Sequence, residues 1–61
     1  MANLTSKELS ALTDQIGQEQ TLISKYRAMA CLCHDQQLQQ QLGSIAQKHK
    51  QHCDMLMSFL Q

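Results

Sequence analysis

Two series of residues, each spaced alternately by three and four positions, constrain the fold of this chain more than any other feature. This spacing places side chains on one face of an α-helix, whereas a half-buried strand alternates at every second residue. The first series is Leu9, Leu12, Ile16, Glu19, Ile23, Tyr26, Ala30 and Cys33. The second is Leu38, Leu42, Ile45, His49, His52, Leu56 and Phe59. The sequence therefore predicts an all-α chain of two amphipathic helices.

The ends of both helices have recognisable capping residues. Thr5 and Glu8 form the pattern of a capping box, and Asp35 is a suitable cap for a second helix. We therefore expect a single antiparallel hairpin unit over residues 1–61, with helices at about 5–33 and 36–60 and a turn at about 33–35. Gly17 and Gly43 lie inside these helices, where each costs about 1 kcal/mol relative to alanine. Their presence predicts a close approach of helices at both positions.

Apolar residues beside the two series are more numerous than a two-helix hairpin needs. A chain of 61 residues buries only about 60% of the surface of its unfolded form, so it usually requires a disulfide, a metal or a partner. Three cysteines, an odd number, do not favour a disulfide framework. We expect a homodimer whose hairpins form a four-helix bundle, with larger assemblies left open. The flanking residues are Leu22, Met29, Ala46, Cys53 and Leu60.

Charge and hydropathy set the expected partners and location. Five Lys and Arg balance five Asp and Glu, which leaves no electrostatic footprint for nucleic acid or an anionic membrane. No apolar run approaches the roughly 20 residues that span a bilayer, and the N-terminus lacks the pattern of a secretory signal. The sequence predicts a cytoplasmic protein that binds neither nucleic acid nor membrane.

Three polar residues interrupt the two series at positions that should meet in the hairpin. If the chain reverses near residue 34, Glu19 lies opposite residues 49 to 52, and the histidines at 49 and 52 share one helix face. A carboxylate in an apolar interior is costly unless a cation or a donor meets it. Glu19, His49 and His52 are therefore a predicted metal site, duplicated in the dimer to as many as six ligands. Zinc is the expected transition metal, and ligand type alone leaves iron, manganese, cobalt, nickel and copper open.

Two other interpretations of the histidines stay open. They could donate hydrogen bonds to Glu19 in a metal-free network that sets dimer pairing, or lie at the surface if the hairpin is rotated. Tyr26 and Cys53 are expected beside the predicted site, although each is also a common packing residue. The thiols of Cys31 and Cys33, at the end of the first helix, are donors that soft metals prefer, but a packing role explains the presence of both cysteines as well.

The order of these residues resembles half of a ferritin-like di-metal bundle. In that superfamily each half supplies one Glu from the first helix and a Glu-x-x-His motif from the second, often with a Tyr two turns after the first Glu. Glu19, Tyr26 and His52 match that pattern, while His49 stands where the superfamily has a bridging Glu. The stretches "MANLTSKELSALTDQIGQEQ" and "IAQKHKQH" are also similar to small coat-F-type spore coat proteins. This resemblance implies a ferritin-like fold, iron as an alternative to zinc in the metal site, and a spore-coat location.

Three functions follow as alternatives. The first is a metal-binding ferritin-like bundle associated with the spore coat, and the second is a structural or assembly protein whose Glu-His network sets pairing. The third is a small di-metal oxidase or peroxide-reactive enzyme of the rubrerythrin sort, which open coordination positions on iron or manganese would allow. The sequence contains no nucleophile-base set and no phosphate-binding loop, so it predicts no catalytic residue and leaves enzymatic activity open.

Overall fold

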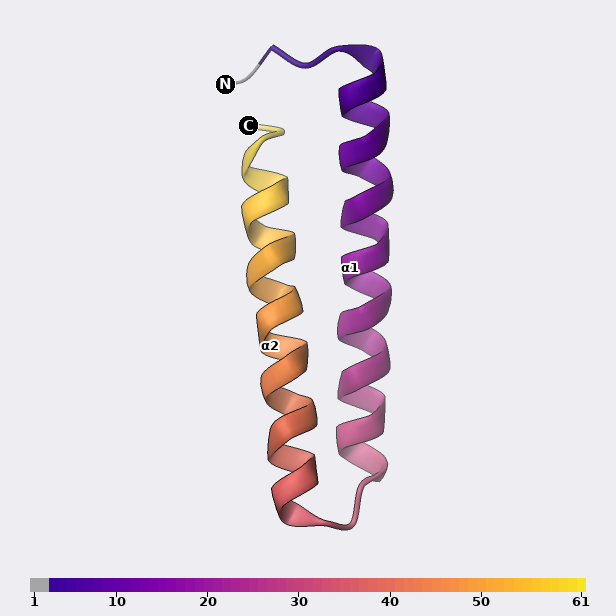
Figure 1. Ribbon diagram of the computed structural model, residues 1–61, viewed down its shortest axis with the longest axis vertical. Coiled ribbons are helices and arrows are strands. Elements are labelled where there is room, and N and C mark those ends of the chain that lie inside the picture. Colours follow the sequence, from indigo (N-terminus) through magenta and orange to yellow (C-terminus); the bar gives the residue numbers. More distant parts are fainter. Residues whose placement is uncertain (1–2) are drawn as a thin grey trace.

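Two long helices lie side by side in opposite directions, joined by a short turn (Figure 1). The structure is a computed structural model that describes residues 3–61. Helix α1 spans Ser6–Leu32 and helix α2 spans Gln36–Ser58. The Cα atoms extend over 46 × 16 × 11 Å. The predicted all-α antiparallel hairpin is confirmed, and both helices begin and end within two residues of the predicted bounds.

Local hydrogen bonds explain where each helix begins. The Thr5 hydroxyl accepts from the Glu8 N–H at 3.0 Å, and Glu8 Oε1 accepts from the Thr5 N–H at 3.0 Å. The hydrogen bond from the Thr5 N–H to the Glu8 carboxylate, and secondly the side chain of Thr5, hold the pKa of Glu8 below its ordinary value of 4.5. Asp35 Oδ1 accepts from the Leu38 N–H at 2.9 Å. Both predicted caps are confirmed, and α1 ends at Leu32 because Cys33 adopts an extended conformation.

The apolar interior of the hairpin is a narrow stripe between the helices. Its buried members are Ile16 and Ile23 from α1, and Leu42, Ala46 and Cys53 from α2. Among the described residues, no large side chain is less than 2% exposed. One neighbouring helix covers only part of a helix face, so each helix keeps apolar side chains on its surface.

Helix α2 is rotated relative to the prediction. Ala46 and Cys53, expected beside the main series, are the most buried residues of α2 at 2% and 4% exposed. Ile45 is half-buried and His52 is exposed, although both were expected to face α1. The small side chains of Ala46 and Cys53 allow close packing of the helices, so this edge of α2 faces inward. Three other members of the predicted series are nearly half exposed: Leu9, Leu38 and Phe59.

The two glycines do not mediate contact within the hairpin. A Cβ atom added at Gly17 or at Gly43 would meet no other atom within 4 Å. The close approach of helices predicted at these positions in the bundle is therefore not made between α1 and α2 of one hairpin. Both glycines lie in open space on a helix surface, where an alanine would fit.

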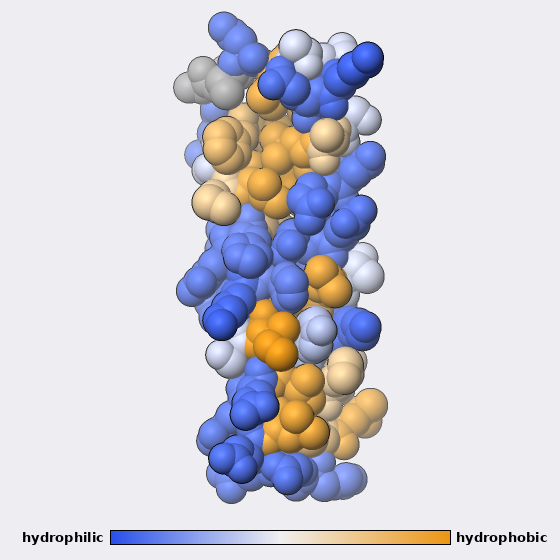
Figure 2. Space-filling view, viewed as in Figure 1, coloured by the Kyte–Doolittle hydropathy of each residue, from blue (hydrophilic) through white to orange (hydrophobic). Residues whose placement is uncertain are grey.

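The surface of the hairpin alternates in polarity along its length. Figure 2 shows two apolar areas toward the two ends of one face, with a hydrophilic band between them. Among residues 3–61, eight large apolar side chains are exposed. Despite this apolar surface, neither described helix contains a stretch apolar and long enough to cross a bilayer. The exposed residues are Leu9, Met29, Leu32, Leu38, Met55, Met57, Phe59 and Leu60.

Candidate metal centre

The hairpin brings Glu19 of α1 together with His49 and His52 of α2. His49 Nδ1 lies 2.9 Å from Glu19 Oε2, and His52 Nδ1 lies 3.6 Å from the same oxygen. One ligand atom from each of the three residues lies within 4.8 Å of the others. Both helices rise about 1.5 Å per residue, so a turn at 33–35 brings these positions to the same height. The convergence expected from the sequence is therefore present, in a group that could hold a metal ion.

Exposure increases steadily across this Glu-His-His group. The side chain of Glu19 is 8% exposed, that of His49 is 22% exposed and that of His52 is 56% exposed. The carboxylate thus lies between the helices, while the group opens to the outside at His52. Within residues 3–61, both imidazole contacts are to Oε2, and no hydrogen bond is made to Glu19 Oε1. The second carboxylate oxygen remains available to a further donor or a cation.

Aromatic contacts orient the two imidazoles. The Tyr26 ring stacks on the His49 ring, with centroids 5.8 Å apart and planes 13° apart. The His52 ring meets the His49 ring edge-on, with centroids 5.8 Å apart and planes 84° apart. Stacking restricts rotation of the His49 ring while its Nδ1 faces Glu19. Tyr26 therefore lies beside the candidate site, in contact with one of its members.

The donor set suits a small divalent transition metal, and the two distances measured from Glu19 Oε2 lie near those of a bound ion. Zinc bound to nitrogen and carboxylate oxygen at 2.0–2.2 Å in a tetrahedron separates its ligand atoms by roughly 3.3–3.6 Å. The distances from Glu19 Oε2 to the two imidazoles, 2.9 and 3.6 Å, lie close to that range. Two imidazoles and one carboxylate leave at least one coordination position open, and the same set binds non-haem iron. Coordination through Nδ1 requires that nitrogen to lose its proton.

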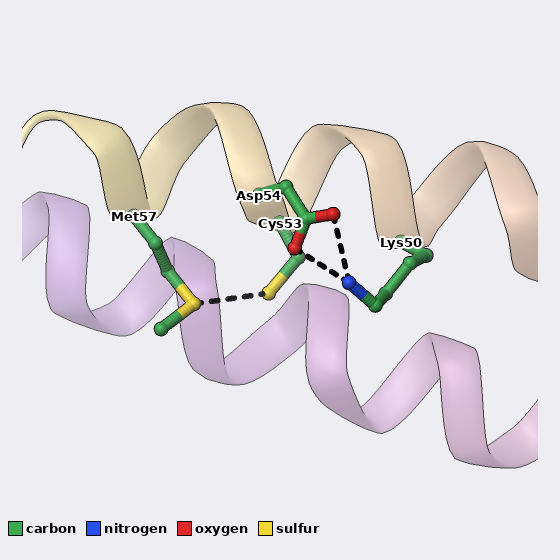
Figure 3. A network of polar contacts seen from close by, with 4 residues as sticks. All are labelled: Lys50, Cys53, Asp54 and Met57. Atoms are coloured by element: carbon green, nitrogen blue, oxygen red, sulfur yellow. Dashed lines mark hydrogen bonds and ion pairs between the residues drawn. The ribbon is translucent and has the colours of Figure 1, made fainter.

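Cys53, also predicted beside the site, makes a different contact. Its thiol donates to Met57 Sδ at 3.9 Å, next to an ion pair in which Lys50 Nζ lies 2.7 Å from both oxygens of Asp54 (Figure 3). Within the described chain, the one group of three convergent metal donors does not include Cys53. The contact between Cys53 and Met57 was not predicted, although their four-residue spacing on one helix was an available signal.

The cysteines at the turn do not join a metal-ligand cluster among residues 3–61. Cys31 is exposed, and the Cys33 thiol donates to the Asp35 carbonyl at 3.4 Å. This hydrogen bond and the partial burial of Cys33 are consistent with a packing role at the end of α1. The three cysteines are free thiols in the structure.

Comparison with known proteins found no matching family model, no matching curated protein and no matching solved structure. The resemblance to ferritin-like and coat-F-type proteins therefore stays a prediction that rests on the residue pattern.

Proposed function

We propose that this chain is a metal-binding helical protein in which Glu19, His49 and His52 hold a transition-metal ion, zinc or iron. The proposal rests on one observation: a buried carboxylate faces two imidazoles, with ligand atoms within 4.8 Å of one another. A buried carboxylate is stabilised when a cation neutralises its charge. Among the described residues, its ion-pair contacts are both to histidines, which are neutral unless protonated.

The nearby lysine of α2 does not supply the missing charge. Lys50 Nζ is paired with Asp54 at 2.7 Å, four residues along the same helix. A divalent cation between Glu19 and the two imidazoles would neutralise the carboxylate and use the lone pairs of both rings. Such an ion would also join α1 to α2, so part of its binding free energy would stabilise the hairpin.

Pairing of two hairpins into a ferritin-like four-helix bundle belongs to this proposal as well. The hairpin leaves one side of the Glu-His-His group open at His52, whose side chain is 56% exposed. A second hairpin over that side would exclude water from the site and bring a second Glu19, His49 and His52 close to the first. Metal bound there would then stabilise both the fold and the pairing.

A metal-free polar network is the second candidate function for the same residues. The observation that favours it is the 2.9 Å contact between His49 Nδ1 and Glu19 Oε2, a good hydrogen bond without any ion. In that case the group would set the register and pairing of the helices in a structural or assembly protein. The two candidates differ in a single measurable quantity, which is the metal content of the purified protein.

Elemental analysis of untagged protein tests the proposal, with a His49→Ala, His52→Ala double variant measured beside the parent. His34→Ala is the matched control, because His34 is exposed at the turn. We expect close to one metal ion per chain in the parent and in the control, and none in the double variant. A metal-free parent after growth and dialysis with zinc or ferrous iron would refute metal binding, as would equal metal in the double variant.

A further inference from the structure

The hairpin exposes more surface than a folded protein of its mass normally does. Its accessible surface is 4774 Å² for a mass of 6.9 kDa, whereas a compact monomer of that mass exposes about 4000 Å². The excess, about 800 Å², equals the area that one partner buries in a standard protein interface. The elongated hairpin thus exposes an excess of surface about as large as the area that one partner buries in a stable interface.

The apolar residues around the Glu-His-His group indicate which surface this is. Residues seven apart on a helix point in nearly the same direction, so Leu38, Ile45 and Phe59 share the side of α2 that carries the exposed His52. Leu22 and Met29 follow Glu19 and Tyr26 of α1 by three positions and lie on the same side of the hairpin. We call this surface the triad face. It consists of Leu22, Tyr26, Met29, Leu38, Ile45, His52 and Phe59.

The triad face has the size and the polarity pattern of an interface between two copies. The two longer dimensions of the hairpin, 46 and 16 Å, enclose about 740 Å², close to the 800 Å² per partner of a stable interface. Apolar areas toward both ends flank a central hydrophilic band, as Figure 2 shows. If a second copy packed on this face, the apolar areas of the two copies would contact each other at both ends, and their central polar groups would meet in the middle.

The position of Glu19 selects the orientation of the second copy. Glu19 has thirteen residues of α1 on either side, from Ser6 to Gln18 and from Gln20 to Leu32. When two hairpins pack in opposite directions, only a group at mid-length meets its own copy while the helices overlap from end to end. In hairpins packed in the same direction, every position lies level with its own copy. The two Glu19 residues would then meet wherever Glu19 lay along α1, so its central position would not be needed.

We infer that the triad face binds a second copy of this chain in the opposite direction, across a two-fold axis at the level of Glu19. The axis places two carboxylates and four imidazoles together, and each group is completed by the partner's residues. This inference rests on the hairpin pairing proposed above and adds its face and direction, but it does not depend on the metal, because a metal-free polar network would use the same pairing. Two carboxylates brought close repel each other, so bound cations should tighten the dimer.

A spin-label distance measurement tests the orientation. Cys31 is exposed near the turn, and Cys33→Ser with Cys53→Ala leaves it as the single thiol to label. Cys31 is twelve residues from Glu19, or about 18 Å along the helix axis at 1.5 Å per residue. Two labels in oppositely directed hairpins should therefore lie about 36 Å apart or slightly more. A distance below about 20 Å would show hairpins packed in the same direction and would overturn the inference.

Sedimentation of two matched charge variants tests the face in the otherwise unmodified chain. Leu38 lies on the triad face and is 48% exposed, whereas Met57, about 100° away from it around α2 and outside that face, is 43% exposed. We expect Leu38→Lys to raise the dimer dissociation constant at least tenfold and Met57→Lys to change it less than threefold. A parent that is monomeric at about 100 μM with zinc present would overturn the inference, as would a greater effect of Met57→Lys.

The outcomes separate this pairing from the proposed metal site. A dimer with labels about 36 Å apart but without metal would keep the pairing and refute the metal site. A monomer with one bound metal ion per chain would keep the metal site and refute the pairing. Capture of a different protein by the triad face, with the chain remaining monomeric, would also refute pairing with a second copy.

Discussion

A Glu19→Leu variant should be more stable than the parent without metal and less stable than the parent with metal. The side chain of Glu19 is 8% exposed, so a leucine there would be buried and would contribute about 2 kcal/mol. Loss of the hydrogen bond to His49 costs about 1 kcal/mol, since the His49 side chain is partly exposed and can bond to water. Without metal, Glu19→Leu should therefore be more stable than the parent by about 1 kcal/mol.

Metal should stabilise only the parent. At a free zinc concentration 100 times the dissociation constant, binding to the folded state adds about 2.7 kcal/mol. For a domain of about 60 residues this raises Tm by roughly 10 to 20 °C. The variant lacks the carboxylate ligand and should gain almost nothing, so the parent becomes the more stable protein by about 2 kcal/mol.

Urea unfolding at one protein concentration, in EDTA and in buffered zinc, measures this reversal. The protein concentration is held constant because dimer formation would otherwise change the apparent stability. His34→Ala serves as a control and should respond to zinc as the parent does. Equal stabilisation of Glu19→Leu and parent by zinc would refute the metal site, and a Glu19→Leu protein that is less stable in EDTA would contradict the calculated effect of burial.

Three further changes have expected outcomes. Gly43→Ala should raise the free energy of unfolding in urea by about 1 kcal/mol, because its Cβ meets no atom within 4 Å; a loss of stability would contradict this. The lowered pKa of Glu8 means that its contribution to stability is present above pH 4.5 and is lost as the pH falls through the lowered value. The Tm should therefore fall less steeply between pH 6 and pH 3 for Glu8→Gln than for the parent. Identical profiles of Tm against pH would count against the capping box. Tyr26→Leu should weaken zinc binding by about two- to tenfold in competition with a chromophoric chelator, since the ring stacks on His49; unchanged affinity would show that the stack does not orient the ligand.

Local sequence determined the helices and their caps. The hydrogen bonds at Thr5, Glu8 and Asp35 link residues three positions apart, so they depend on no distant part of the chain. The meeting of Glu19 with His49 and His52 also follows from the sequence. Two helices with the same rise per residue, joined by a short turn, bring positions equally far from the turn together.

Only the tertiary structure decided which side of α2 faces α1. Two adjacent stripes of α2 are largely apolar, one with Ile45 and His52 and the other with Ala46 and Cys53, and periodicity alone does not choose between them. Packing of small side chains selects the second stripe and leaves His52 56% exposed. That rotation opens one side of the Glu-His-His group, because contact between two helices depends on the shapes of both surfaces and not on the hydrophobic pattern of either one.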